Sequence, residues 1–244
     1  MTLFTKYYYL TKILRIFKVL KKPFLDFSQL GEEKIIINIL ERISAKHKIN
    51  QCYIDIGGFD PIIYSNTYKL YNKNWSGVVV EPNKKVTKYW NKVRPNDFVI
   101  NSALVPNTYK FEEVKIYTNN QNKANDSRIQ KSENQSKNFY ISKVIKLNEL
   151  ISICEKKFSK PFFLNLDIEG YENDIILDLN DINYKIPLIC VELFLNRSIE
   201  DQSIFNYKNL KSVKYLEDNG YILVSVYGIS LIFCHKDLWI PFSR

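Results

Sequence analysis

Histidine and glycine are scarce in this chain of 244 residues. The histidines, His47 and His235, lie far apart and form no HxxxH or HExxH pattern, which disfavours a zinc site. The seven glycines form no GxGxxG pattern, which disfavours the dinucleotide site of a nicotinamide-dependent oxidoreductase. The sequence also lacks an uninterrupted apolar run of about 20 residues, the length that a transmembrane helix needs.

Cysteine is limited to four residues, and no two of them form a CxxC pair. Three of the four lie in apolar stretches, so we expect buried, reduced thiols. Residues 1–25 place lysines among apolar side chains and have no small-residue cleavage site, so they do not resemble a secretory signal. We therefore expect a cytoplasmic protein. The cysteines are Cys52, Cys154, Cys190 and Cys234.

Positive charge is concentrated at the N-terminus. The formal net charge is +9, and residues 1–25 hold six bases and no acid. The rest of the chain has 29 bases against 26 acids, a balance that predicts no nucleic-acid-binding surface. The abundance of Lys, Asn, Ile and Tyr is typical of an AT-rich genome and suggests a bacterial source.

Residues 1–26 are expected to form a separate N-terminal element. Its basic amphipathic helix runs from Tyr7 to Lys22 and ends before Pro23. Such a helix suits peripheral contact with an anionic membrane at its inner face. The alternative is a helix packed on the domain with a solvated basic face. The bases that recur three, three and four residues apart are Lys12, Arg15, Lys18 and Lys22.

The remainder, residues 27–244, reads as one α/β domain. Strands alternate with helices, which predicts a mostly parallel sheet with helices on both faces. Two strands flank Gly228 closely and must be antiparallel, so the sheet should end in a C-terminal hairpin. Helices are expected over 35–43, 66–74, 84–93, the later part of 144–155, and 210–219. Strands are expected over 52–56, 77–80, 98–100, 162–168, 188–194, 221–226 and 229–234.

Residues 118–138 interrupt this alternation with a polar stretch whose single large apolar residue is Ile129. A segment of this length and composition is typical of a lid or of a disordered loop. As a lid, its bases would suit a phosphorylated or nucleotide-linked sugar. These bases are Lys123, Arg128, Lys131 and Lys137.

Two motifs predict a ligand site at the ends of strands. The buried strand at 52–56 carries Asp55 and leads into Gly57 and Gly58, a turn that lets a ligand approach the main chain. The next strand ends at Glu81, followed by Pro82 and Asn83. An acid at this position suits the two hydroxyls of a ribose. The alternative is an acid that stabilises the start of the following helix.

A third motif holds carboxylates at the end of the apolar run 162–168. Asp167 and Glu169 are two residues apart, so an extended strand would point them to the same side. Glu192 follows the next apolar run and is expected at the equivalent strand end. Such a group suits a general base, or a divalent cation such as Mg²⁺ held by Asp167 and Glu192. The alternative is that Asp167 and Glu169 cap the following helix.

In combination these motifs resemble the FkbM-type methyltransferases, a branch of the class I S-adenosylmethionine-dependent enzymes. The likeness covers about residues 27–233. One departure is visible, because Gly58-Phe59-Asp60 stands where many class I enzymes place further glycines. The matching pieces, in the family's order, are residues 28–32, 53–61, 65–67, 74–77, 81–83 and 166–172.

The resemblance implies a Rossmann-like sheet of seven strands and a methyltransferase domain over 27–244. It places the turn from Asp55 to Gly58 at the methionine part of S-adenosyl-L-methionine and Glu81 at its ribose. Asn101, Ser102 and Ala103 would lie near the adenine. The full set of expected cofactor-binding residues is Asp55, Gly57, Gly58, Asn66, Glu81, Pro82, Asn83, Ser102, Ala103 and Asp167.

The function expected from these residues is O-methyl transfer to a sugar hydroxyl of a nucleotide-linked sugar, glycan or glycolipid, in surface polysaccharide biosynthesis. Asp167 is the first candidate for the base, with Glu169 and Glu192 in support, and no histidine lies in the motifs. One alternative is a non-catalytic cofactor-binding module recruited to a membrane by the basic helix. Another is an RNA methyltransferase, which the pI of about 9.1 suggests and the balanced body opposes. The oligomeric state is left open.

Overall fold

The computed structural model describes residues 26–118, 127–128, 139–168, 170–193 and 204–241. The N-terminal element expected over 1–26 therefore lies almost wholly outside the described residues, as do Glu169 and most of the polar stretch 118–138. Within the described ranges, no helix is long and apolar enough to cross a membrane.

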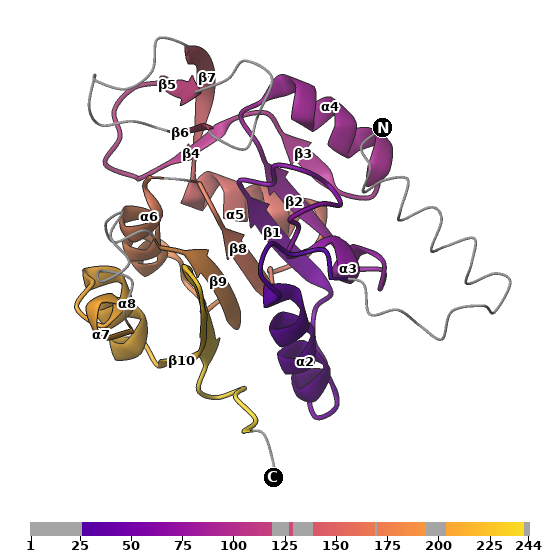
Figure 1. Ribbon diagram of the computed structural model, residues 1–244, viewed down its shortest axis with the longest axis vertical. Helices are drawn as coiled ribbons and strands as arrows, with labels where there is room; N and C mark the ends of the chain where they lie inside the picture. The colour runs from indigo at the N-terminus through magenta and orange to yellow at the C-terminus, as the bar shows by residue number, and fades with distance from the viewer. Residues whose placement is uncertain (1–25, 119–126, 129–138, 169, 194–203, 242–244) are drawn as a thin grey trace, which may run out of the picture.

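A seven-stranded sheet forms the centre of the molecule (Figure 1). Its strand order is β10-β11-β9-β8-β1-β2-β3, and the pairings from β9 to β3 are all parallel. The central strands β1, β2, β8 and β9 are short, mainly apolar runs buried on both faces over most of their length, as expected for a parallel sheet covered by helices. The strands of the sheet are β1 Cys52–Ile56, β2 Ser76–Val80, β3 Phe98–Ile100, β8 Phe163–Leu166, β9 Leu188–Glu192, β10 Tyr221–Tyr227 and β11 Ser230–His235.

The C-terminal hairpin is confirmed, with one detail that the sequence did not predict. β11 pairs antiparallel with both β10 and β9, so the second strand of the hairpin is inserted between the first and the rest of the sheet. The edge strand β10 therefore runs in the same direction as β9. Gly228, in the turn, has a φ of +60°, which suits glycine.

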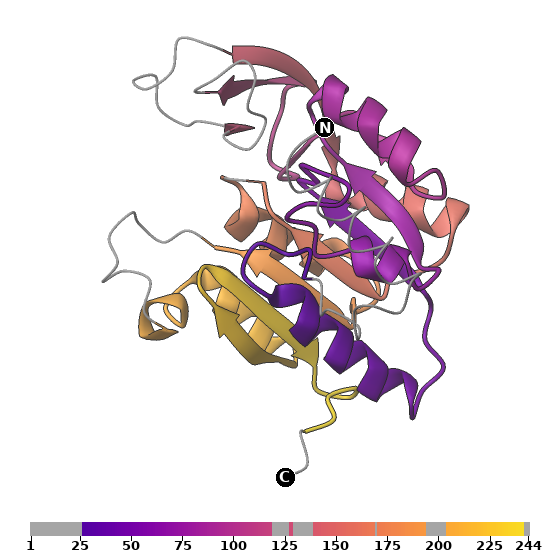
Figure 2. The same cartoon turned by 45° about the vertical axis from the view of Figure 1, so that its right-hand side comes forward.

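Helices cover both faces of the sheet (Figures 1 and 2). On one face α5 and α8 bury Leu150 and Val213 against strand residues such as Ile54, and on the other α2 buries Ile36 beside Tyr53. The expected Rossmann-like α/β fold is thus confirmed. The helices are α2 Glu32–Ser44, α3 Tyr68–Tyr71, α4 Lys84–Val93, α5 Leu147–Lys157, α6 Glu172–Asp178, α7 Ile204–Tyr207 and α8 Lys211–Asp218.

A second sheet, which the sequence did not predict, has the order β4-β7-β5-β6. Its strands are β4 Ala103–Val105, β5 Glu113–Thr118, β6 Ser127–Arg128 and β7 Phe139–Lys146. In β5 the buried residues Val114 and Ile116 alternate with exposed ones, so the signal is two apolar residues in a polar segment. This signal is too weak to identify a strand by itself.

Several predicted elements are longer than the observed ones. The helix expected over 66–74 is only α3, the strand expected over 162–168 ends at Leu166, and the strand expected over 188–194 ends at Glu192. Thr67 bonds to Asp55 in β1, and the Asp167 N–H donates to the Ile56 carbonyl at 3.0 Å as β1 also ends.

Candidate active site

A cavity of about 380 Å³ opens at the carboxyl ends of the parallel strands. The chain passes from β1 to β2 on one side, whereas β8 is the neighbour of β1 on the other, so the strand order reverses here. Open α/β sheets bind their ligands in the crevice at such a switch point. The position of the cavity therefore marks it as the candidate active site.

Most of the residues predicted for the site line this one cavity. They are Asp55, Gly57, Gly58, Asn66, Glu81, Pro82, Ser102, Ala103, Asp167 and Glu192. The reason is topological, because the carboxyl ends of neighbouring parallel strands meet at one edge of the sheet.

Two described candidates do not line the cavity: Asn101, whose side-chain amide donates to the Glu81 and Pro82 carbonyls, and Asn83. The Asn83 side chain caps α4 by accepting a hydrogen bond from the Lys85 N–H at 2.9 Å. Its own N–H donates to Glu81 Oε1 at 2.6 Å, so the contribution of Asn83 to the site is made through the backbone.

Several residues that line the cavity were not predicted. Gln29 and Asp60 lie in two of the segments that match the FkbM-type family, 28–32 and 53–61. Their place in those segments could have identified them as site residues. Ile116 comes from the unpredicted strand β5 and had no such signal. The lining residues outside the prediction include Gln29, Phe59, Asp60, Tyr64, Ser65, Leu104, Ile116, Asn165, Ile168 and Ile229.

The two glycines after β1 are required because neighbouring parts of the chain leave no room for a Cβ at either position. Gly57 has a φ of +81°, and a Cβ there would lie 1.5 Å from the Asp167 carbonyl oxygen. A Cβ on Gly58 would lie 2.7 Å from the Trp90 ring. The sequence correctly predicted a close approach at this turn, and in the structure the approaching groups belong to Asp167, directly after β8, and to Trp90 in α4.

Asp55 is buried and its two carboxylate oxygens are held by different partners. Asn165 Nδ2 donates to Oδ1 at 2.9 Å, and the Thr67 hydroxyl donates to Oδ2. Asn66 Nδ2 in turn donates to Asn165 Oδ1 at 3.0 Å. The carboxylate is therefore fixed in orientation while retaining lone pairs toward the cavity it lines.

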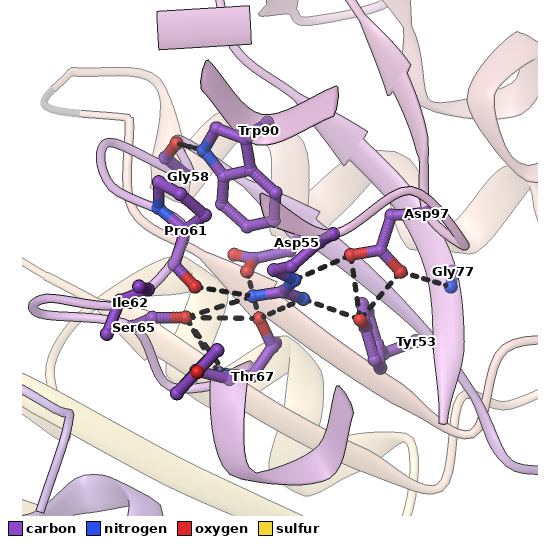
Figure 3. A network of polar contacts seen from close by, with 12 residues as sticks. Tyr53, Asp55, Gly58, Pro61, Ile62, Ser65, Thr67, Gly77, Trp90 and Asp97 are labelled. Atoms are coloured by element: carbon purple, nitrogen blue, oxygen red, sulfur yellow. Dashed lines mark hydrogen bonds and ion pairs between the residues drawn. The ribbon is translucent and has the colours of Figure 1, made fainter. Parts of the chain in front are cut away.

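Sequence reasoning missed Arg94, a fully buried arginine that bonds to Tyr53, Thr67 and Asp97, all three labelled in Figure 3. Its Nε donates to Asp97 Oδ2 at 2.7 Å, and its Nη2 donates to Thr67 Oγ1 at 3.0 Å and to the Tyr53 hydroxyl. The guanidinium carbon also lies 4.2 Å from the centroid of the Trp90 ring. Arg94 thus links α4 to the Thr67 hydroxyl that holds Asp55.

Glu81 carries a perturbed carboxyl group. Burial raises its pKa to about 8, against the opposing effect of the hydrogen bond from the Asn83 N–H; the charge of Asp55 adds a smaller increase. At neutral pH the side chain is therefore mostly protonated in the free protein. A ligand whose hydroxyls donate to Glu81 would favour the ionised form.

The charge of the cavity lining is of one sign. The acidic residues are Asp55, Asp60, Glu81, Asp167 and Glu192, and no lysine, arginine or histidine of the described chain lines it. Such a lining favours a cationic ligand or an uncharged one rich in hydroxyls, and disfavours phosphates.

Asn66 adds a further feature, because its Oδ1 is buried without a hydrogen-bond partner among the described residues. This oxygen is available to an N–H or O–H of a ligand.

The divalent cation is not supported by the described part of the chain. Asp167 and Glu192 both line the cavity, but no group of three or more His, Cys, Asp or Glu residues within the described ranges is placed to hold a metal ion. The argument that Asp167 and Glu169 share one side of a strand was wrong for Asp167, because β8 ends one residue earlier.

Comparison with curated proteins gives no match. A family model described as the methyltransferase FkbM domain matches residues 55–223, a range that contains the end of β1, all of β8 and β9, and most of the cavity-lining residues. The matched range covers more than half of the chain, and the chain therefore belongs to the FkbM methyltransferase family.

Proposed function

We propose that this methyltransferase uses S-adenosyl-L-methionine to methylate a sugar hydroxyl. The observation that carries the proposal is the acidic cavity at the switch point of the sheet. S-adenosylmethionine has a sulfonium and an ammonium group, and both are cations that such a lining favours. A nicotinamide dinucleotide or a free nucleotide would bring phosphates into a lining whose described residues include no base.

The residues present fit this cofactor. Glu81 would accept the hydroxyls of the ribose, and Ser102 and Ala103 would lie beside the adenine. Asp55 and the unpartnered Asn66 Oδ1 are acceptors suited to the ammonium group. The bound cofactor would supply an electrophilic methyl group on its sulfonium centre.

In the reaction, the protein's own residues would hold the acceptor hydroxyl and take its proton. Asp167 is our candidate for the base, because it follows β8 at the centre of the sheet edge and lines the cavity. Glu192, at the end of the neighbouring β9, would orient the acceptor. Fixed placement of these groups contributes to the rate by reducing the entropic cost of reaching the reactive geometry.

Among acceptors, an uncharged sugar residue of a glycan or glycolipid fits the described lining better than a nucleotide-linked sugar. The bases suited to a diphosphate, such as Lys123 and Lys131, lie outside the described residues. We further propose a place for these products in surface polysaccharide synthesis, on the family resemblance alone.

Calorimetric titration with S-adenosylhomocysteine tests the proposal. Micromolar binding by the wild type should be lost in Glu81→Ala and kept within about twofold in Asn83→Ala, since the backbone N–H that bonds to Glu81 remains. Asp167→Asn should bind S-adenosylhomocysteine and lose methyl transfer from labelled S-adenosylmethionine to sugar acceptors. A folded wild-type protein that does not bind S-adenosylhomocysteine would overturn the proposal.

A further inference from the structure

Tyr64 adopts an unusual backbone conformation at the rim of the cavity. Its φ is +59°, and the other non-glycine residue of the described chain with a positive φ is Asn74, at +66°. Asparagine tolerates the left-handed region, whereas a bulky aromatic residue there is an outlier. Tyr64 lines the cavity and is 56% exposed, so burial of its ring does not account for its presence.

The loop around Tyr64 is fixed from several sides. Asp60 Oδ1 accepts hydrogen bonds from the N–H groups of Ile62 and Ile63 at 2.8 and 2.9 Å. Arg94 Nη1 donates to the Pro61 carbonyl at 3.4 Å and to the Ser65 hydroxyl at 3.3 Å (Figure 3). These contacts hold the residues on both sides of Tyr64. Strain that the surroundings impose in this way is typical of functional sites.

Further contacts link the Tyr64 loop to the hairpin side of the cavity, just as Arg94 links it to the end of α4. The Ser65 N–H donates to the Phe27 carbonyl at 2.9 Å, which joins the loop to the segment that carries Gln29. This segment in turn meets the hairpin, because the Ser230 hydroxyl donates to Glu32 Oε1 at 2.9 Å.

The same side of the cavity also receives the end of β9. The Leu193 N–H donates to the Ile229 carbonyl at 2.9 Å, which ties the residue after Glu192 to the hairpin turn. We call the cavity-lining residues Gln29, Tyr64, Glu192 and Ile229 the rim subsite.

Within the rim subsite, Glu192 and Ile229 lie away from the residues assigned to the cofactor nucleoside. Glu81 and Ser102 follow β2 and β3, at the opposite end of the strand order from β9 and β11. Strands lie about 4.8 Å apart, so four strand spacings separate the end of β9 from that of β3, roughly 19 Å in all. A ligand that occupies the β1, β2 and β3 ends therefore leaves the rim subsite for a second molecule.

We propose that the rim subsite binds the methyl acceptor and that Tyr64 is a specificity-determining residue that packs against the apolar face of an uncharged sugar ring. This inference rests on the proposed function. It specifies where the methyl acceptor binds and that the acceptor is uncharged. A sugar ring presents C–H groups on a face and hydroxyls at its edge. An aromatic ring matches the face, and the amide of Gln29 and the carboxylate of Glu192 match the hydroxyls. A phosphorylated sugar would meet Asp60 and Glu192 with no base in the described lining.

The test compares Tyr64→Asn and Tyr64→Phe with Asn74→Gly, a matched change at the other left-handed residue, which lies outside the cavity lining. The probes are S-adenosylhomocysteine, followed by calorimetry, and a panel of methyl hexopyranosides and hexose 1-phosphates, followed by saturation-transfer NMR with and without S-adenosylhomocysteine. Thermal unfolding reports on stability.

In the wild type we expect binding of at least one methyl hexopyranoside and weaker binding of the matching phosphate. Tyr64→Asn should weaken this binding at least tenfold, keep the S-adenosylhomocysteine affinity within twofold, and unfold at the same or a higher temperature. Tyr64→Phe should keep the pyranoside binding, and Asn74→Gly should leave both ligands unaffected. A higher unfolding temperature together with lost pyranoside binding is a combination that a merely structural tyrosine would not give.

Three results would overturn the inference: wild-type protein that binds S-adenosylhomocysteine but no pyranoside, pyranoside binding unchanged in Tyr64→Asn, or equal losses of both ligands in that variant. Pyranoside binding that depends on Tyr64 without any S-adenosylhomocysteine binding would support the rim subsite and overturn the proposed cofactor.

Discussion

The raised pKa of Glu81 predicts a specific pH dependence of ligand binding. The carboxyl group is buried, and its pKa is raised to about 8 in the free protein. If the ionised group accepts the hydroxyls of a ribose, binding below pH 8 requires the loss of one proton. The affinity for a ribose-containing ligand should therefore increase with pH up to about 8 and level off above it.

The magnitude follows from the ionised fraction of Glu81. With a pKa of about 8, the group is about 1% ionised at pH 6, about 10% at pH 7 and about 90% at pH 9. The affinity should thus rise about tenfold per pH unit between pH 6 and 7. From pH 6 to 9 the total is about 90-fold, or about 2.7 kcal/mol.

Methylthioadenosine is the suitable ligand, because it keeps the ribose and adenine and has no group of its own that titrates in this range. Calorimetry in buffers of different ionisation enthalpy should count about one proton released at pH 6.5 and none at pH 9.5. Glu81→Gln should bind more weakly at pH 9 and show no pH dependence. Asp167→Asn, which changes another cavity carboxylate, should keep the wild-type slope.

An affinity that stays constant between pH 6 and 9 in the wild type would refute the reasoning. The same slope in wild type and Glu81→Gln would also refute it, since another group would then carry the titration.

Other perturbations test the parts of the fold that build the site. Gly57→Ala should cost at least about 3 kcal/mol in urea unfolding or prevent folding, because its Cβ would lie 1.5 Å from the Asp167 carbonyl oxygen; a loss below 1 kcal/mol would contradict this geometry. Arg94→Met should cost about 3–5 kcal/mol in the same assay, because it leaves a buried carboxylate unpaired, and a neutral effect would argue against the network. Burial raises the pKa of Glu33 to about 7, so the folded state binds more protons than the unfolded state between about pH 4.5 and 7. The free energy of unfolding should therefore fall with rising pH across this window by about 3 kcal/mol from this group, and Glu33→Gln should remove that part of the slope. Deletion of residues 1–25, which hold six bases and no acid, should abolish binding to anionic vesicles in flotation assays and leave S-adenosylhomocysteine binding unchanged; equal vesicle binding by both forms would exclude this segment as the membrane contact.

Much of the fold could be predicted because its signals are local. The apolar runs at 52–56 and 188–192 are dense enough to identify buried strands, and the close spacing around Gly228 requires a hairpin. β5 was missed because Val114 and Ile116 stand among polar residues. β7 was missed because its apolar residues do not follow one burial pattern, with Phe139 and Ile141 exposed and Ile145 buried. Their stability comes from pairing with each other, which local composition does not report.

The site divides in the same way between local and tertiary information. Asp55, Glu81, Asp167 and Glu192 lie at or directly after the ends of four strands, and the rule that parallel strands end at a common edge was sufficient to bring them together. The role of Asn83 could not be predicted in this way. Asn83 lies three residues after the end of β2, where a side chain can either face the ligand or cap the next helix.

The sequence by itself thus determined the α/β class, the edge of the sheet at which the site lies, and the cavity-lining residues at the strand ends, such as Asp55, Glu81 and Asp167. Tertiary structure decided that Arg94 holds Thr67 beside Asp55 and that the pKa of Glu81 is raised. It also decided that Tyr64 is fixed in a left-handed conformation at the rim. These features depend on burial and on contacts between residues far apart in the chain, and neither is encoded in a local pattern.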